Sequence, residues 1–325
     1  MNEKKRFFLK AASAAALAYP ALGRAQDASR VARVVVGFPA GGSVDVVART
    51  LGSQMQNSLG RTLVVENRAG AGGRIALTHL KTAPTDGSAI LISPASMFTI
   101  YPSSFKELAY DPVADFKPVA AYMDVVSCFF VSGKAPVKTF EEYVSWVKKD
   151  PQSRAFFGSP AEGSMPHFLG MTVMQSAGLP INPIPYKGTA PLVSDAIGGH
   201  VMAGVVPLSE AIEGHMAGNL RVVAIGGTSR FERLPDVPTF QELGLKVTGG
   251  AEWYGVFLPA GASDAVADTY YDALSQAVKS KEVIDSFGPK AWVVNMRNGQ
   301  ALTAMIKEEK ENWRQVLASL QYTPQ

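Results

Sequence analysis

The sequence predicts an α/β protein built from two lobes. The first observation is a repeated order of elements, in which a buried strand, a loop of small residues and a helix of period 3.6 follow one another. This order starts at residues 31–37 and again at residues 155–158. The second observation is the length of 325 residues, which favours about two domains. The apolar content of 47% and the charged content of 18% are typical of a globular chain.

Residues 1–25 have the three-part layout of a secretory signal peptide. Basic residues open the chain, residues 11–22 are apolar and rich in alanine, and small residues precede a cut after Ala25. An apolar stretch of this length falls short of the roughly 20 residues that cross a bilayer as a helix. We therefore expect export to the periplasm. Residues 5–10 resemble the twin-arginine motif with Lys5 in place of the first arginine, so the Sec and Tat routes both stay open.

The charge of the mature chain differs from that of the whole sequence. Residues 1–25 hold five of the 31 basic residues and one of the 28 acidic residues, which leaves 26 basic and 27 acidic residues. A net charge of about −1 gives the mature protein no electrostatic reason to bind nucleic acid or an anionic membrane. The one cysteine, Cys128, excludes an internal disulfide, and its apolar neighbours predict a buried, inert thiol.

The first stretch begins with a valine-rich strand at residues 31–37, which ends at the small residues 38–42. A helix follows at residues 44–59, with Ser43 as the expected N-cap and Gly60 as the expected stop. Next come a strand at residues 63–66, a glycine-rich turn at 70–73, a short helix at 75–81 and a strand at 89–93. Strands that alternate with helices in this way indicate a parallel sheet.

The second stretch starts with a helix at residues 139–149 and a short strand at 155–158. The loop 159–165 leads into a helix at 166–177, and the turn 186–188 leads into a helix that ends at 198–199. Residues 201–206 and 221–226 are expected strands. From residue 264 to the end the pattern is helical, with one apolar stripe made of Leu302, Met305, Ile306, Trp313, Leu317 and Leu320.

We expect the chain to cross between the lobes near residues 125–127 and again near residues 251–253. The first lobe would then consist of residues 26–126 and 252–325, and the second of residues 127–251. Strand order does not follow from periodicity.

The turn at Gly41, Gly42 and Ser43 is the first candidate binding element. Free N–H groups at a helix start and the positive end of the helix dipole attract anions, so Gly42, Ser43 and Val44 can hold a carboxylate. The alternative is a tight turn in which Ser43 only caps the helix, and spacing alone favours it. Asp45 would repel a bare carboxylate, so it either caps the helix or orients a water or an amine of the ligand.

The loop 159–167 is the matching strand-to-helix loop of the second stretch, and Ser159 and Ser164 can meet the same ligand. Ser164 and His167 also suggest a nucleophile and its base, but no third orienting group is evident, which favours a structural role. Ser93 and Ser96 follow a predicted parallel strand, at the end where ligands bind in open α/β sheets. Trp253 either walls a pocket or packs the seam between the lobes.

The sequence lacks several common enzyme motifs. The sequence has no Gly-x-Ser-x-Gly elbow and no Walker A motif, and Gly70-x-Gly72 lacks the third glycine of a dinucleotide loop. The four histidines show no zinc spacing. We therefore expect a protein without catalytic residues, metal or cofactor, with a Ser164–His167 hydrolase as the less favoured alternative.

Several segments match a known family in order, each of them weak alone. They are residues 37–45 (GFPAGGSVD), 65–73 (VENRAGAGG), 83–87 (APTDG), 110–119 (YDPVADFKPV), 185–188 (PYKG), 234–239 (LPDVPT) and 253–257 (WYGVF). Together they resemble the solute receptors of tripartite tricarboxylate transporters, the TctC-like or Bug family. The resemblance runs from about residue 34 to the C-terminus.

The resemblance implies a two-lobed type II periplasmic-binding-protein architecture, with two parallel-rich sheets flanked by helices and a ligand cleft between them. It implies a monomeric receptor that carries a small carboxylate to an inner-membrane permease; presentation of the ligand to a membrane sensor is the alternative. The implied ligand-binding residues come from the two loops and the strand ends, and are Phe38, Ala40, Gly41, Gly42, Ser43, Asp45, Ser93, Ala95, Ser96, Ser159, Glu162, Gly163, Ser164, Met165, His167, Val206, Pro207 and Trp253.

Two departures from the family pattern concern the ligand. The family often has an Asp-Asn pair where this chain has Val206 and Pro207. The second loop, usually small and polar, carries Glu162 and two prolines here. A pocket without the Asp-Asn pair should bind amino acids poorly, so we expect an apolar or aromatic carboxylate.

Overall fold

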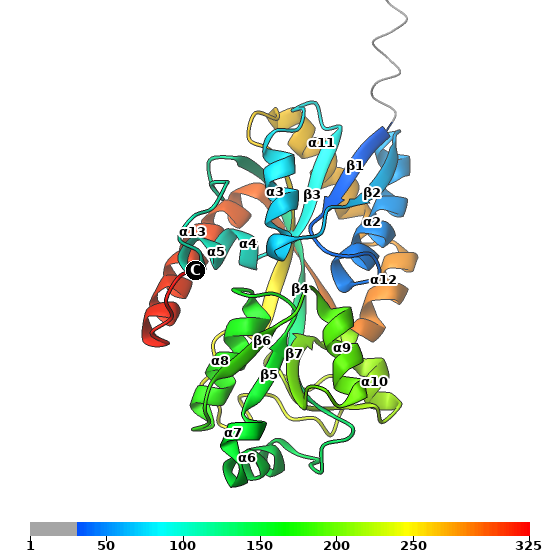
Figure 1. The fold of residues 1–325 in the computed structure, drawn as a ribbon. Helices are drawn as coiled ribbons and strands as arrows, with labels where there is room; N and C mark the ends of the chain where they lie inside the picture. Colours follow the sequence, from blue (N-terminus) through cyan, green and yellow to red (C-terminus); the bar gives the residue numbers. More distant parts are fainter. Residues whose placement is uncertain (1–30) are drawn as a thin grey trace, which may run out of the picture.

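The structure is a computed structural model that describes residues 31–325. The expected signal peptide lies outside the described residues. In the described range, ten strands form one curled sheet in the order β2-β1-β3-β9-β4-β7-β5-β6, with β8 and β10 also paired to β4. Helices flank the sheet, and the sheet and its helices form an upper and a lower half in Figure 1. No helix within residues 31–325 is both long and apolar enough to cross a membrane.

The upper half of the sheet is built from strands rich in β-branched residues. The start of β1 alternates between exposed and buried residues and its end is fully buried, as in a strand that enters a core. β1 pairs in parallel with β2 and β3, and β3 pairs antiparallel with β9. The strands of this half are β1 (Val31–Val36), β2 (Thr62–Asn67), β3 (Ala89–Pro94), β9 (Ala251–Pro259) and β10 (Trp292–Asn298).

Helix α2 (Ser43–Leu59) buries its apolar face, including Val47, Leu51 and Met55. Gly60 ends the helix with a φ of 61°, in the left-handed conformation that glycine adopts easily, as the sequence predicted. The remaining helices of this half are α3 (Arg74–Lys81), α4 (Ser96–Thr99), α5 (Tyr101–Ser104), α11 (Asp264–Ala277), α12 (Lys281–Phe287) and α13 (Gly299–Ser319), with the 3-10 turns η1 (Ala71–Gly73) and η3 (Gly288–Lys290).

The lower half repeats the parallel arrangement, because β5 (Phe156–Ser159) pairs in parallel with both of its neighbours. Helix α6 (Phe140–Lys149) starts at Thr139, whose hydroxyl accepts a hydrogen bond from the Glu142 N–H. The other elements are β6 (Asn182–Pro185), β7 (Ala203–Pro207), β8 (Leu220–Ile225), α7 (Pro151–Arg154), α8 (Met165–Ser176), α9 (Thr189–Gly198), η2 (Leu208–Glu210) and α10 (Ile212–Met216).

One long strand, β4 (Phe116–Ser132), runs through both halves. Its first part pairs antiparallel with β9 and β10, and its last part pairs antiparallel with β7 and β8. Val126 is the last residue opposite β9, and Ser127 is the first opposite β7. The expected parallel pairs therefore occur in the outer strands, whereas β4 and β9 add antiparallel pairs that periodicity does not reveal.

The C-terminal region corrects one sequence prediction. Residues 264–325 are not helical throughout, because β10 lies between α12 and α13 and pairs antiparallel with β4. Trp292 is buried opposite Val125, while Val293 and Val294 are exposed, and such β-branched residues favour a strand. The apolar stripe of α13 packs in the core as expected, with its most buried members at Leu302, Ile306, Trp313 and Leu317.

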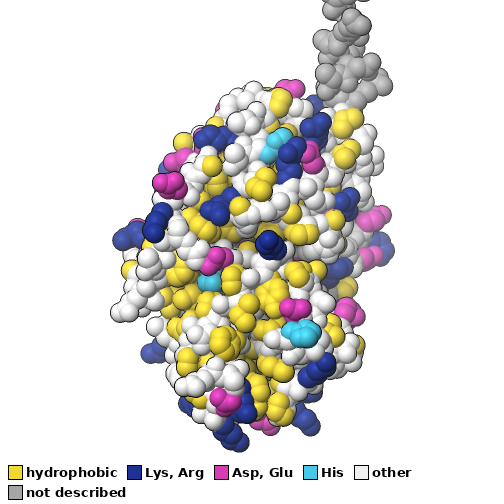
Figure 2. Space-filling model, viewed as in Figure 1, with side chains coloured by type: hydrophobic (Ala, Val, Ile, Leu, Met, Phe, Trp, Pro, Cys, Tyr) yellow, Lys and Arg dark blue, Asp and Glu magenta, His cyan; other side chains and the backbone are white. Residues whose placement is uncertain are grey.

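Cys128 is fully buried in the apolar cluster of the lower half, as its neighbours predicted. Burial raises the pKa of its thiol, which keeps it protonated and unreactive. On the molecular surface, positive and negative side chains are interspersed over the face in Figure 2. Hydrophobic side chains gather on that face around and below the level where the two halves meet (Figure 2).

Candidate ligand-binding site

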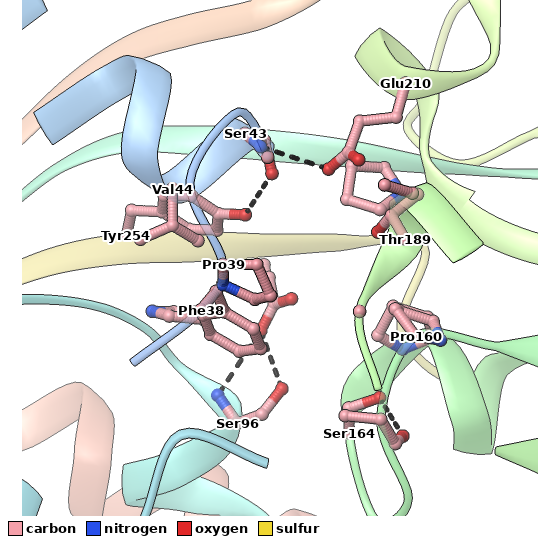
Figure 3. A pocket seen from close by; sticks show the side chains of 18 of the residues that line it. Phe38, Pro39, Ser43, Val44, Ser96, Pro160, Ser164, Thr189, Glu210 and Tyr254 are labelled. Carbon is pink, nitrogen blue, oxygen red and sulfur yellow. Dashed lines mark hydrogen bonds between the residues drawn. The ribbon is translucent and has the colours of Figure 1, made fainter. Parts of the chain in front are cut away.

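A cavity lies between the two halves of the sheet, and both halves contribute to its walls. In this arrangement the cavity has about 90 Å³ of free space, which suits a small ligand. The upper half supplies Phe38, Pro39, Ala40, Gly42, Ser43, Val44, Pro94, Ser96, Met97, Tyr101, Glu252 and Tyr254. The lower half supplies Pro160, Ala161, Ser164, Pro166, Gly188, Thr189, Ala190, Pro191, Pro207 and Glu210, some of which face the upper residues in Figure 3.

The start of α2 reaches the cavity through the Gly41–Gly42 turn. Gly41 has a φ of 85°, a conformation that side chains disfavour. Gly42, not Ser43, is the N-cap, so the prediction of Ser43 as a side-chain cap is wrong. The Ser43 hydroxyl instead shares a 3.2 Å hydrogen bond with the Tyr254 hydroxyl, and the Ser43 N–H donates to Glu210 Oε1 at 3.2 Å (Figure 3). The anion position predicted at this helix start thus holds a carboxylate of the protein itself.

Asp45 does not line the cavity. Its carboxylate accepts hydrogen bonds from the Gly41 N–H at 2.9 Å, from Asn67 Nδ2 at 2.8 Å and from Arg49 Nε at 3.0 Å. Burial disfavours the charged form, but these hydrogen bonds outweigh it and lower the pKa of Asp45. Asp45 therefore closes the turn before α2 without capping the helix, and leaves the ligand to other groups.

Two glutamates that sequence reasoning missed lie in the cavity walls. Glu252 Oε2 accepts hydrogen bonds from the Ser96 N–H at 3.3 Å and from the Ser96 hydroxyl at 2.8 Å. Desolvation raises the pKa of Glu252 to about 7, although the Ser96 hydrogen bonds oppose it. Desolvation also raises the pKa of Glu210, opposed by hydrogen bonds from Ser43 and Thr189. The sequence held one signal for each: Glu210 lies shortly after the predicted strand 201–206, and Glu252 lies in the crossing expected near residues 251–253.

The second loop contributes Ser164 and Pro166 but not its acid. The Ser164 hydroxyl donates to the Ala161 carbonyl at 2.6 Å, and the Met165 N–H donates to Ser96 Oγ at 3.0 Å across the two halves. Glu162 lies outside the cavity, where its carboxylate accepts a hydrogen bond from Gln325. The repulsion expected between Glu162 and a bound carboxylate therefore does not arise in this arrangement.

Ser164 and His167 do not form a nucleophile–base pair. His167 Nδ1 shares a 3.1 Å hydrogen bond with Ser159, whereas Ser164 bonds to a backbone carbonyl. Ser159 and His167 are both buried and lie off the cavity. Burial lowers the pKa of His167 to about 4, so it is neutral at pH 7. This geometry leaves Ser164 without a histidine base at the cavity.

The structure divides the residues expected at the site into three groups. Those brought together around the cavity are Phe38, Ala40, Gly42, Ser43, Ser96, Ser164 and Pro207. Ala95, Met165 and Trp253 line a neighbouring cavity, where Trp253 Nε1 donates to Glu309 at 2.9 Å. Those that line neither cavity are Gly41, Asp45, Ser93, Ser159, Glu162, Gly163, His167 and Val206.

Comparisons with known proteins identify the family and agree with the fold. The family model described as "Tripartite tricarboxylate transporter family receptor" matches residues 47–321. Protein BugT of Bordetella pertussis is 32% identical over 290 residues, 89% of each chain. The solved periplasmic binding protein BugD is 30% identical, with a TM-score of 0.86 over 94% of this chain and all of that one. MatC (Rpa3494) from Rhodopseudomonas palustris, solved with bound malate, is 26% identical, with a TM-score of 0.83 over 89% and 99%.

The family match, the related sequences and the solved structures confirm the resemblance that the sequence motifs carry. The chain therefore belongs to the tripartite tricarboxylate transporter receptor family, the TctC-like or Bug family, as a two-lobed periplasmic solute-binding protein.

Proposed function

We propose that the protein captures a small, largely apolar carboxylate between its lobes and delivers it to a tripartite permease in the inner membrane. The observation that carries the proposal is the cavity whose walls come from both halves of the sheet. A ligand there contacts both halves at once, so it stabilises the closed arrangement over an open one. The lobes are residues 26–126 with 252–325, and residues 127–251.

The start of α9 in the lower lobe can bind the carboxylate of the ligand. Thr189 and Ala190, the first residues of α9, line the cavity after Gly188, whose φ is 115°. The first N–H groups of a helix lack intrahelical partners and attract anions. MatC, a related receptor, is solved with malate, a carboxylate. Apolar residues make up most of the remaining wall, which supports an apolar body on the ligand.

The proposal involves binding without chemistry. Ser164 has no base beside it, and the buried Ser159–His167 pair lies off the cavity. We further propose that residues 1–25 direct export and that the mature receptor acts as a monomer, which presents its closed lobes to the permease. The description of the matching family as a transporter receptor supports this partner.

Thermal unfolding of the mature chain, residues 26–325, tests the proposal. The panel contains aliphatic and aromatic monocarboxylates, malate, adipate and citrate. A ligand that binds only the folded state stabilises it by RT ln(1 + [L]/Kd), about 2.7 kcal/mol at 100 times Kd. We expect a clear rise of Tm with at least one apolar acid, and calorimetric titration then gives its Kd. A panel of acids without effect on protein that was unfolded, refolded and freed of bound ligand would contradict the proposal.

A further inference from the structure

Two glutamate side chains approach the cavity from opposite lobes, Glu210 at the end of η2 and Glu252 in β9. We propose that the ligand carries a cationic nitrogen, which Glu210 and Glu252 bind, on an otherwise apolar body. The inference rests on the proposed function, because it takes this cavity as the ligand site. It makes the two glutamates the residues that determine specificity.

The charges around the cavity are unbalanced. Among the residues of the described chain that line it, Glu210 and Glu252 are acidic and none is Lys, Arg or His. Burying a carboxylate is costly unless it is paired or fully hydrogen-bonded. Desolvation dominates the shift of both carboxyl groups, which shows that neither is solvated as in bulk water. A cation delivered by the ligand would balance this charge.

The protein's own hydrogen bonds leave acceptor sites on both carboxylates. Ser43 donates to Glu210 Oε1, Thr189 is a second donor to the Glu210 carboxylate, and Ser96 donates to Glu252 Oε2. Glu252 Oε1 accepts no hydrogen bond from residues 31–325. Both side chains are half-buried; Glu210 lines this cavity, and Glu252 lines both this cavity and the neighbouring one. An ammonium group, with three donors, suits these acceptors.

Tyr254 lines the same cavity as the two glutamates and does not take the ligand cation from them. Tyr254 lines the cavity and shares its hydroxyl hydrogen bond with Ser43, the residue that also holds Glu210. Burial first, and then the charges of Glu252 and Glu210, raise the pKa of the Tyr254 phenol. Tyr254 therefore stays protonated and does not compete for a ligand cation as an anion would.

The cationic nitrogen inferred here and the carboxylate of the proposed function together make the ligand an apolar amino carboxylate. Its ammonium group meets Glu210 and Glu252, its carboxylate meets the start of α9, and its hydrocarbon body meets the apolar walls. This reverses the expectation that amino acids bind poorly, which rested on the missing Asp-Asn pair at Val206 and Pro207. Glu210, three residues beyond Pro207, restores an acidic group to the cavity.

Two matched series of probes test the inference by calorimetric titration at pH 7.5. The first is 3-phenylpropionate, phenylalanine and 2-phenylethylamine, and the second is 4-methylpentanoate, leucine and 3-methylbutylamine. Within each series the hydrocarbon body stays and the charged groups change. We expect the zwitterion to bind at least tenfold more tightly than the carboxylate, about 1.4 kcal/mol. Glu210→Gln and Glu252→Gln should each remove that advantage, whereas Glu213→Gln, an exposed acid on α10, should keep it.

The outcomes separate the inference from the proposed function. If a carboxylate binds as tightly as its amino analogue in the wild type, the inference is wrong and the proposed function stands. If it also binds more tightly at pH 6 than at pH 8, a protonated glutamate donates to it, and the inference is again wrong. If the amine binds more tightly than the zwitterion, the ligand carries a cationic nitrogen, and the proposal that it also carries a carboxylate is wrong. If none of the six probes binds, the inference is contradicted for both hydrocarbon bodies.

Discussion

The carboxylate of Glu210 accepts a hydrogen bond from the backbone N–H of Ser43, at 3.2 Å, across a separation of 167 residues in the sequence. Ser43 begins α2 in the upper lobe, and Glu210 ends η2 in the lower lobe. The same serine bonds Tyr254 through its hydroxyl. The start of α2 therefore contacts the lower lobe through Glu210 and the cavity wall through Tyr254. Desolvation raises the pKa of Glu210.

The first prediction concerns the free energy of unfolding of a Glu210→Gln variant. Glutamine keeps an oxygen that accepts from the Ser43 N–H and removes a desolvated charge. We expect the ligand-free protein to gain about 1 kcal/mol at pH 8, because burying a charge without a cation is unfavourable. Urea unfolding at pH 8 measures the change. Glu213→Gln, at an exposed acid paired with Arg233, should stay within about 0.5 kcal/mol; a loss of stability in Glu210→Gln would contradict the prediction.

A second prediction concerns Ser96, whose hydroxyl is hydrogen-bonded to two groups. It donates to Glu252 at 2.8 Å and accepts from the Met165 N–H of the lower lobe at 3.0 Å. In Ser96→Ala the buried Met165 N–H loses its partner, which costs about 1 to 3 kcal/mol. Urea unfolding at pH 7 gives this difference, with Ser53→Ala on the exposed side of α2 as the matched control. Equal stability of the two variants would mean that water replaces the Ser96 hydroxyl.

A third prediction compares two glycines inside helices. Replacing a helical glycine by alanine stabilises a helix by about 1 kcal/mol where space allows. At Gly52 in α2 a Cβ would meet Leu63 at 3.7 Å, an ordinary contact, so Gly52→Ala should raise Tm. At Gly170 in α8 a Cβ would lie 2.1 Å from the Phe157 ring, so Gly170→Ala should lower Tm. Thermal unfolding of both variants decides, and a rise of Tm in Gly170→Ala would show that Phe157 moves aside freely.

Much of the fold follows from local sequence patterns. The valine-rich β1, the period of α2 and the left-handed Gly60 are local features, and the structure has all three where they were predicted. β10 was missed because Trp292 is its one fully buried residue, and Val293 and Val294 are both exposed. The segment therefore lacks the alternation of apolar and polar residues by which a strand is predicted, although it pairs with β4. The antiparallel pairs of β4 depend on contacts across the whole chain, which no local window contains.

The site was less predictable than the fold. The sequence identified the loops that reach the cavity, and Ser43, Ser96 and Ser164 line it. It did not identify which loop residues turn away, because Asp45 is held by Asn67 from β2 as well as by Arg49 on the next turn of α2. Glu210 and Glu252 were missed for a related reason. An acid beside a strand end is ordinary in a sequence, and only the packing of the two lobes makes these acids part of one cavity.

The last prediction concerns the pH dependence of stability. Desolvation raises the pKa of Glu252 from 4.5 to about 7 in the folded protein. The folded state therefore binds this proton more tightly than the unfolded state, so the stabilising effect is complete below pH 4.5 and is lost as the pH rises to 7. Glu252→Gln removes the titration. We expect the variant to gain, relative to wild type, on the order of 3 kcal/mol between pH 4.5 and pH 7.5.

Other groups near Glu252 require that the variant be compared with wild type at each pH. Desolvation also raises the pKa of Glu309 to about 7, and this residue titrates with the same sign. Burial lowers the pKa of His167 to about 4, so its titration destabilises the protein as the pH falls below 6.5. Both groups remain in Glu252→Gln and cancel in the difference, apart from their coupling to Glu252. A difference in unfolding free energy that stays constant from pH 4.5 to 7.5 would show that Glu252 is solvated through the cavity, which would also remove its need for a cationic partner.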